Sequence, residues 1–101
     1  MRMMILVQFP PEPFNAATRN GTIGSKMKQI LDAMKPEAAY FSERNGKRGG
    51  IFVVNINEPA EVPRLAEPWF LNFNAEVEIR VCMTPEDFAK ANLDELGKKW
   101  A

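Results

Sequence analysis

Residues 48–56 carry the longest uninterrupted run of β-branched and aromatic side chains in the chain. Glycines precede this run and Asn57-Glu58-Pro59 follows it, a pattern typical of a strand bounded by turns. Because successive side chains of a strand point to opposite faces, Ile51 and Val53 point one way and Phe52 points the other. Both faces are therefore apolar, and we expect this strand to lie at the centre of a sheet.

The first strand is predicted over Met3–Phe9, and both of its faces are again largely apolar. Prolines at positions 10, 11 and 13 should end it, because proline cannot donate to a strand ladder and holds the following chain extended. These two strands have the same character, so both are candidates for the interior of the sheet.

A helix is predicted after these prolines and should end near residue 34. Either Asn15 or Thr22 is its N-cap, and Asn20-Gly21 is a point at which it can divide in two. Lys35 precedes Pro36, which biases Lys35 out of the helical region. The apolar positions at helical spacing are Ile23, Met27, Ile30, Leu31 and Met34.

Two more strands have one polar face each. Alternation from Glu37 to Arg44, followed by the turn sequence Arg44-Asn45-Gly46-Lys47, predicts a hairpin into the central strand. The segment Ala75–Met83 alternates strictly between apolar and polar residues. Both segments therefore have the pattern of edge strands.

Two further helices complete the prediction. The first has apolar residues between Val62 and Phe70, and we expect about two irregular turns because Pro63 and Pro68 interrupt it. A C-terminal helix should begin at Thr84-Pro85-Glu86-Asp87, which has an N-cap residue, a proline at the first helical position and an acidic residue three after the cap. This helix can restart at Asn92.

The predicted order is strand, helix, strand, strand, helix, strand and a terminal helix, which is the α+β, ferredoxin-like βαββαβ arrangement. In this fold the first and third strands are central in a four-stranded antiparallel sheet, and the predicted polarity of the four strands agrees with that. With 101 residues, the chain is expected to form one domain spanning residues 1–101.

The two crossover helices of this fold cover one face of the sheet, which leaves the second apolar face exposed in a monomer. A homodimer in which two sheets pack face to face, a dimeric α+β barrel, would cover it. The alternative is that the C-terminal helix folds back over the same face.

The amino-acid composition excludes several classes of function. Lys plus Arg and Asp plus Glu number 13 each, so no nucleic-acid or membrane partner is indicated. The apolar start is too short for a signal peptide or a membrane span, and one cysteine suits a reducing, cytoplasmic location. Histidine is absent, which removes imidazole acid–base chemistry and the commonest metal ligand. We predict no metal and no cofactor.

The tract Arg48-Gly49-Gly50-Ile51-Phe52-Val53 partly matches the third-strand motif of RNA-recognition domains, which share this element order. Gly50 stands where the first stacking aromatic would be. We therefore expect no RNA binding.

A candidate pocket follows from the second sheet face. Arg80 could hold a carboxylate by a two-pronged hydrogen bond, and Glu78, if desolvated, could accept a proton. The alternative is that Glu76, Glu78 and Arg80 form a solvated or cross-strand-paired edge. No catalytic residue is assigned. The polar residues expected on this face are Gln8, Tyr40, Ser42, Glu78 and Arg80, together with Cys82 as a small apolar filler.

Segments such as Glu67-Pro68-Trp69-Phe70-Leu71 and Met83-Thr84-Pro85-Glu86-Asp87 resemble a family of short uncharacterised bacterial proteins. Some members carry the label pantothenate synthetase, but this chain is far too short for a nucleotide-binding ligase domain and has no histidine for that enzyme's nucleotide-binding motif. The matching segments are Lys35-Pro36-Glu37-Ala38, Tyr40-Phe41, Glu67-Pro68-Trp69-Phe70-Leu71, Phe73, Ala75-Glu76-Val77-Glu78, Met83-Thr84-Pro85-Glu86-Asp87 and Leu93-Asp94-Glu95-Leu96-Gly97-Lys98-Lys99-Trp100.

More distantly, the layout is similar to the dimeric α+β barrel superfamily, which includes muconolactone isomerases, cofactor-free monooxygenases and haem-degrading enzymes. The resemblance implies the fold and the dimer, and no catalytic residue follows from it. Two hypotheses result. The first is a dimeric barrel that binds a small, carboxylate-bearing molecule in a sheet-lined cavity; the alternative is a cofactor-independent isomerase or monooxygenase that uses the same cavity.

Overall fold

The computed structural model covers residues 1–101 and has the predicted ferredoxin-like arrangement. The sheet order is β2-β3-β1-β4 with every neighbouring pair antiparallel, so β1 and β3 are central as expected. In chain order the elements are β1 (Arg2–Phe9), α1 (Pro11–Arg19), α2 (Ile23–Met34), β2 (Ala38–Arg44), β3 (Lys47–Asn55), α3 (Glu61–Phe73), β4 (Glu76–Val81), α4 (Pro85–Lys90) and α5 (Leu93–Lys99).

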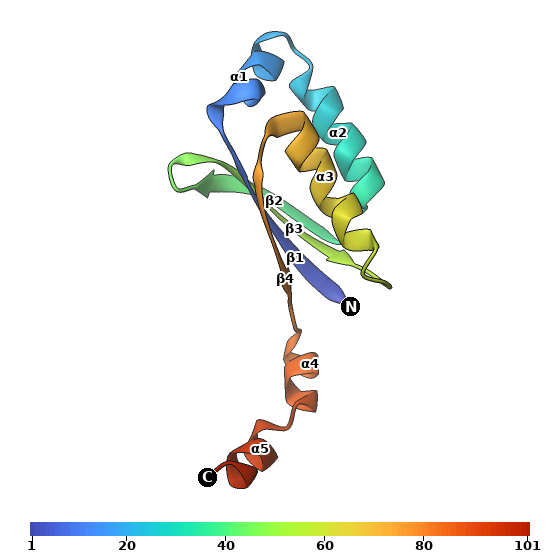
Figure 1. The fold of residues 1–101 in the computed structure, drawn as a ribbon, viewed down its shortest axis with the longest axis vertical. Helices are drawn as coiled ribbons and strands as arrows, with labels where there is room; N and C mark the ends of the chain where they lie inside the picture. The colour runs from blue at the N-terminus through green and yellow to red at the C-terminus, as the bar shows by residue number, and fades with distance from the viewer.

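Helices α1, α2 and α3 lie on one side of the sheet, and the core is the layer between them and the strands (Figure 1). The indole of Trp69 stacks on the ring of Phe52, with 5.0 Å between centroids, and both side chains are fully buried. The strand residues that face the helices and are buried are Met3, Ile5, Val7, Phe9, Phe52 and Val54. This is one of the two apolar faces that the alternation predicted.

The first helical region differs from the prediction at its start. Helix α1 begins at Pro11, where we expected extended chain, because a proline in the first turn loses no intrahelical hydrogen bond. Only Glu12 leaves helical geometry there. The division at Asn20-Gly21 is confirmed: Gly21 has φ +78°, and α2 follows Thr22. Lys35, in the left-handed region, ends α2.

The prediction of a two-turn second helix is wrong. Helix α3 runs for 13 residues. Pro63 lies in its first turn, where a backbone N–H would have no partner, so only Pro68 costs an internal hydrogen bond. Burial of Leu65, Trp69 and Phe73 against the sheet outweighs that loss.

Residues 82–101, here called the C-terminal arm, extend away from the domain (Figure 1). The chain measures 59 × 29 × 19 Å and has a radius of gyration of 16.9 Å, whereas a compact chain of this length has about 13 Å. The arm restarts at Asn92, as the sequence allowed, which separates α4 from α5. Neither helix has a buried residue. The alternative, that the C-terminal helix folds back over its own sheet, is therefore wrong.

An ion pair connects strands at the end of the sheet where β1 begins. Arg2 donates to the Glu37 carboxylate, and the Asn55 amide donates to the same carboxylate at 3.4 Å. The hydrogen bond from Arg2 holds the pKa of Glu37 below its ordinary value of 4.5. This contact joins the segment before β2 to β1, across the end of β3.

Gly50 is required by the close approach of a core ring. A Cβ at Gly50 would lie 2.7 Å from Cζ of Phe52, and that ring cannot move away because Trp69 covers it. We expect Gly50→Ala to lower the free energy of unfolding by about 1–3 kcal/mol, measured by urea denaturation. The matched control is Gly24→Ala in helix α2, where a Cβ meets nothing within 4 Å. That change should be neutral or stabilising. Equal effects of the two changes would contradict the steric explanation.

The ion pair of Glu37 predicts an acid-dependent contribution to stability. The pKa of Glu37 is lower in the folded protein than its ordinary value of 4.5. The charged carboxylate therefore stabilises the fold at pH values above 4.5, and this contribution is lost as the pH falls through the pKa of the folded state. Glu37→Gln should therefore lower the Tm at pH 7, and the difference from the parent should shrink towards pH 3. Glu67→Gln is the control, because Glu67 makes no side-chain hydrogen bond or ion pair. A Tm difference independent of pH would refute this assignment.

Candidate functional site

The sheet face opposite the helices, here called the open face, contains all five residues that the sequence placed in a pocket. Strand register aligns its side chains in three rows, each crossing all four strands. The rows are Glu78-Leu6-Ile51-Tyr40, Arg80-Met4-Val53-Ala38 and Glu76-Gln8-Gly49-Ser42. The predicted assignment of Gln8, Tyr40, Ser42, Glu78 and Arg80 to one face is confirmed.

The centre of the open face is apolar and no helix covers it. Met4, Leu6, Ile51 and Val53 occupy it and are partly exposed. Tyr40, at the β2 edge of the same face, is 66% exposed. An apolar surface on two central strands is the expected property of a face that packs against something else.

Two guanidinium groups meet on the carboxylate of Glu78. Arg44 Nη2 donates to Oε1 at 2.6 Å, and Arg80 Nη2 donates to Oε2. The hydrogen bond from Arg80 and the charge of Arg44 hold the pKa of Glu78 below its ordinary value. Glu78 is thus an ion-pair partner and a poor proton acceptor, as in the paired-edge alternative.

The contact of Arg44 with Glu78 is unusual because it joins the two edge strands, β2 and β4. It is possible because the β2–β3 hairpin bends over the open face: the amide of Asn45, in its turn, donates to Oε1 of Gln8 on β1 at 2.9 Å. Gly49 leaves room for this bend, since a Cβ there would lie 3.0 Å from Cβ of Arg44. The hairpin therefore closes one end of the open face.

Gln8 connects this bend to the opposite edge. It is the one buried polar side chain of the chain, and its amide nitrogen donates to the Glu76 carboxylate at 3.4 Å. At the other end of the face lies the Arg2–Glu37 ion pair described above. Polar contacts thus border the apolar centre at both ends.

The remaining predicted residues have unused hydrogen-bonding groups. The hydroxyls of Tyr40 and Ser42 make no hydrogen bond within the chain. Ser42 lines a small hollow of about 90 Å³ together with Arg44 and Ile51. Cys82 is a free, half-buried thiol whose backbone N–H extends the β4 ladder to the Arg2 carbonyl.

Sequence reasoning missed Arg44 and Asn45 as parts of this site, because both belong to a hairpin turn that normally points into solvent. The one available signal was Gly49 inside a strand, a position that often marks close approach of another segment. Arg44 adds a second cation beside Arg80.

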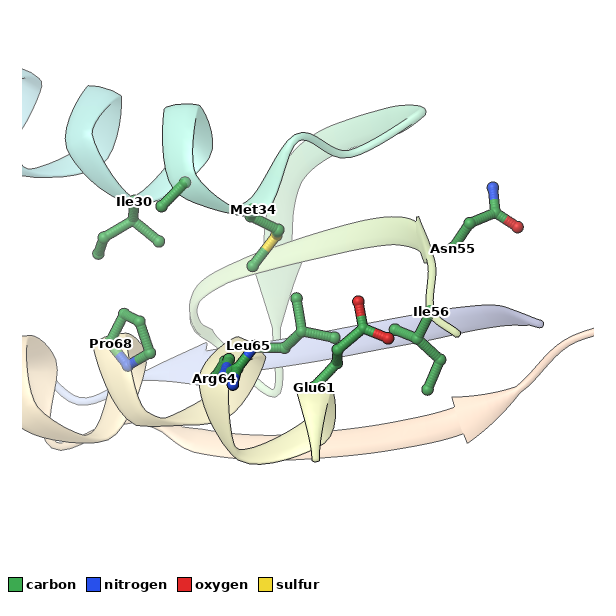
Figure 2. Close-up of a pocket in the computed structure, with 9 residues that line it drawn as sticks. Ile30, Met34, Asn55, Ile56, Glu61, Arg64, Leu65 and Pro68 are labelled. Carbon is green, nitrogen blue, oxygen red and sulfur yellow. The ribbon is translucent and has the colours of Figure 1, made fainter. Parts of the chain in front are cut away.

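Larger cavities lie on the helical side of the sheet. One, of about 350 Å³, lies between α2 and α3, with Ile30 and Met34 facing Leu65 (Figure 2). Glu61, at its border, accepts hydrogen bonds from the backbone N–H groups of residues 57 and 58, and these lower its pKa. Glu61 thus holds the loop before α3, and Asn55 and Arg64 are the other polar residues that line this cavity.

The second cavity, of about 540 Å³, lies between α1 and the hairpin. Arg48, on its wall, stacks over the ring of Phe14 with 4.4 Å between Cζ and the centroid, and donates to Asn15 at 2.7 Å. These contacts tie the guanidinium of Arg48 to helix α1.

The chain contains no group of three or more Cys, Asp or Glu side chains placed to hold a metal ion. None of its helices has the length and apolar character needed to cross a bilayer.

Comparisons with known proteins identify no family for this chain. No family model matches the chain, and no curated protein matches it. Among solved structures, the chain is similar to a de novo designed protein, Ferredog-Diesel, at 14% identity and a TM-score of 0.49, over 80% of this chain and 85% of that one. The fold class therefore rests on the strand order and connections described above.

Proposed function

We propose that two copies of this chain pack open face to open face as an α+β barrel and bind a small carboxylate-bearing molecule between the sheets. Support for the dimer comes from the apolar centre of the open face, which the chain's own helices leave uncovered. A small-molecule site of this kind needs an apolar floor with a few converging polar groups. A single cysteine suits a reducing, cytoplasmic location for such a protein.

One observation carries the choice of ligand: Arg44 and Arg80 share a single carboxylate. Together, Arg44, Arg80 and Glu78 have a net charge of +1, and they lie beside an apolar surface. Guanidinium groups bind carboxylates in a two-pronged geometry, so a ligand carboxylate can take a place beside that of Glu78. The free hydroxyls of Tyr40 and Ser42 lie on the same face and can contact the rest of the ligand.

The lowered pKa of Glu78 favours a binding function over a catalytic one. A cofactor-independent isomerase or monooxygenase needs a proton acceptor whose pKa lies near the working pH. Two arginines instead depress the pKa of Glu78, and the chain has no histidine to replace it. No other feature of the open face favours the catalytic alternative.

The arginines should control ligand binding. We expect at least one small carboxylate, from a panel of aliphatic and aromatic mono- and dicarboxylic acids, to raise the Tm of the parent protein. Arg80→Ala and Arg44→Ala should each weaken its binding at least 10-fold in calorimetric titrations, since each removes a charge-assisted contact. Arg64→Ala, on the helical side of the domain, is the matched control and should leave binding unchanged. The absence of any carboxylate ligand, or binding indifferent to both arginine changes, would refute the proposal.

Glu78→Gln should have the opposite effect. It removes the carboxylate that competes for both guanidinium groups and repels an anionic ligand, so affinity for the same carboxylate should rise several-fold. Glu43→Gln is a control of equal charge change, because Glu43 contacts only the backbone of the hairpin turn. Weaker binding by the Glu78 variant would show that Glu78 positions the arginines instead of competing with the ligand.

A further inference from the structure

The C-terminal arm has apolar side chains that nothing in the chain covers. Phe88 is 52% exposed and Trp100 is 76% exposed, and Met83, Leu93 and Leu96 are exposed as well. Figure 1 shows α4 and α5 beyond the end of the sheet, away from the three helices of the domain.

The arm nevertheless has clear helix signals. Thr84 and Asp87 form a reciprocal capping box at the start of α4, with both hydrogen bonds at 3.1 Å. Helices of six and seven residues are too short to be stable in water by themselves, since isolated helices need about 12–15 residues. The arm therefore needs a surface to pack against.

Helix α5 has one apolar side. Leu93, Leu96 and Trp100 follow one another at spacings of three and four residues, which places them on the same side of a helix. The Lys98–Glu95 pair is exposed to solvent. This distribution is typical of a helix that packs on one side only.

The arm's own domain does not supply that surface. The backbone of Cys82 still belongs to the β4 ladder, through its hydrogen bond to the Arg2 carbonyl at 3.0 Å. Only Met83 then separates the ladder from the Thr84 cap. So short a connection directs the arm away from its own sheet.

Strand β2 presents a matching surface. It is an edge strand, and its two large apolar side chains, Tyr40 and Phe41, point to opposite faces. Phe41 is 53% exposed. Ala39, on the same face as Phe41, is also exposed.

We propose that the arm of each copy packs against strand β2 of a second copy, so that the two copies exchange arms. This proposal rests on the proposed dimer and adds a second contact to it. Covering Phe88 and Trp100 would remove about 300 Å² per arm from water. With both arms and the matching β2 surfaces, the total is about 1,200 Å², which is within the range of stable interfaces.

Site-directed cross-linking tests the exchange directly. In a Cys82→Ser background, one chain carries Ala39→Cys on β2 and another carries Leu96→Cys on α5; the two are mixed and oxidised. We expect a disulfide-linked product containing one chain of each kind, in at least 10-fold excess over the product from a Ser25→Cys and Leu96→Cys mixture. Ser25 is exposed on α2. A chain carrying both Ala39→Cys and Leu96→Cys should link to a second chain. A product with the mass of one chain would overturn the exchange.

The mass in solution separates this proposal from the barrel. The parent should be a dimer, and the double variant Leu96→Ser, Trp100→Ser should raise its dissociation constant at least 10-fold, whereas Lys98→Ala, on the charged side of α5, should not. If the parent and the double variant dimerise equally, arm exchange is wrong and the barrel stands. If the arm variants dissociate but Arg80→Ala leaves carboxylate binding intact, the ligand site is wrong and arm exchange stands. A monomeric parent would overturn both.

Discussion

The structure depends on a mismatch between a sheet with two apolar faces and helices that cover only one of them. In the βαββαβ order both crossover connections pass on the same side of the sheet, so α1–α3 pack against Ile5, Phe52 and their neighbours. The alternating side chains, Leu6 and Ile51 among them, remain uncovered. Burial of apolar area is the main favourable term in folding, so this uncovered area is an unused source of stabilisation in the molecule.

Most of the fold was predictable because period-two alternation is a local signal. It assigned each strand, identified β1 and β3 as central, and located the Asn45-Gly46 turn, where both residues have positive φ. The errors in the predicted helix boundaries came from proline residues. A proline destabilises a helix little in its first turn and more in its interior. The effect of Pro11 and Pro63 therefore depends on where each helix begins, and the sequence does not define that residue.

The candidate site was predictable only as a set of side chains on one face. Alternation placed Gln8, Tyr40 and Arg80 correctly, because the register of a sheet fixes which side chains share a face. The contacts among them were not predictable. Whether Arg44 reaches Glu78 depends on the bend of a hairpin, and that bend results from the packing of all four strands.

The bridge from Arg44 to Glu78 has a mechanical consequence. Because it connects the two outermost strands, the curvature of the sheet is coupled to the charge on a single carboxylate. Protonation of Glu78, or an anion that competes for Arg44, weakens this contact, and the Asn45–Gln8 hydrogen bond then holds the hairpin bend alone. A ligand that binds Arg44 therefore also loosens the contact between strands β2 and β4.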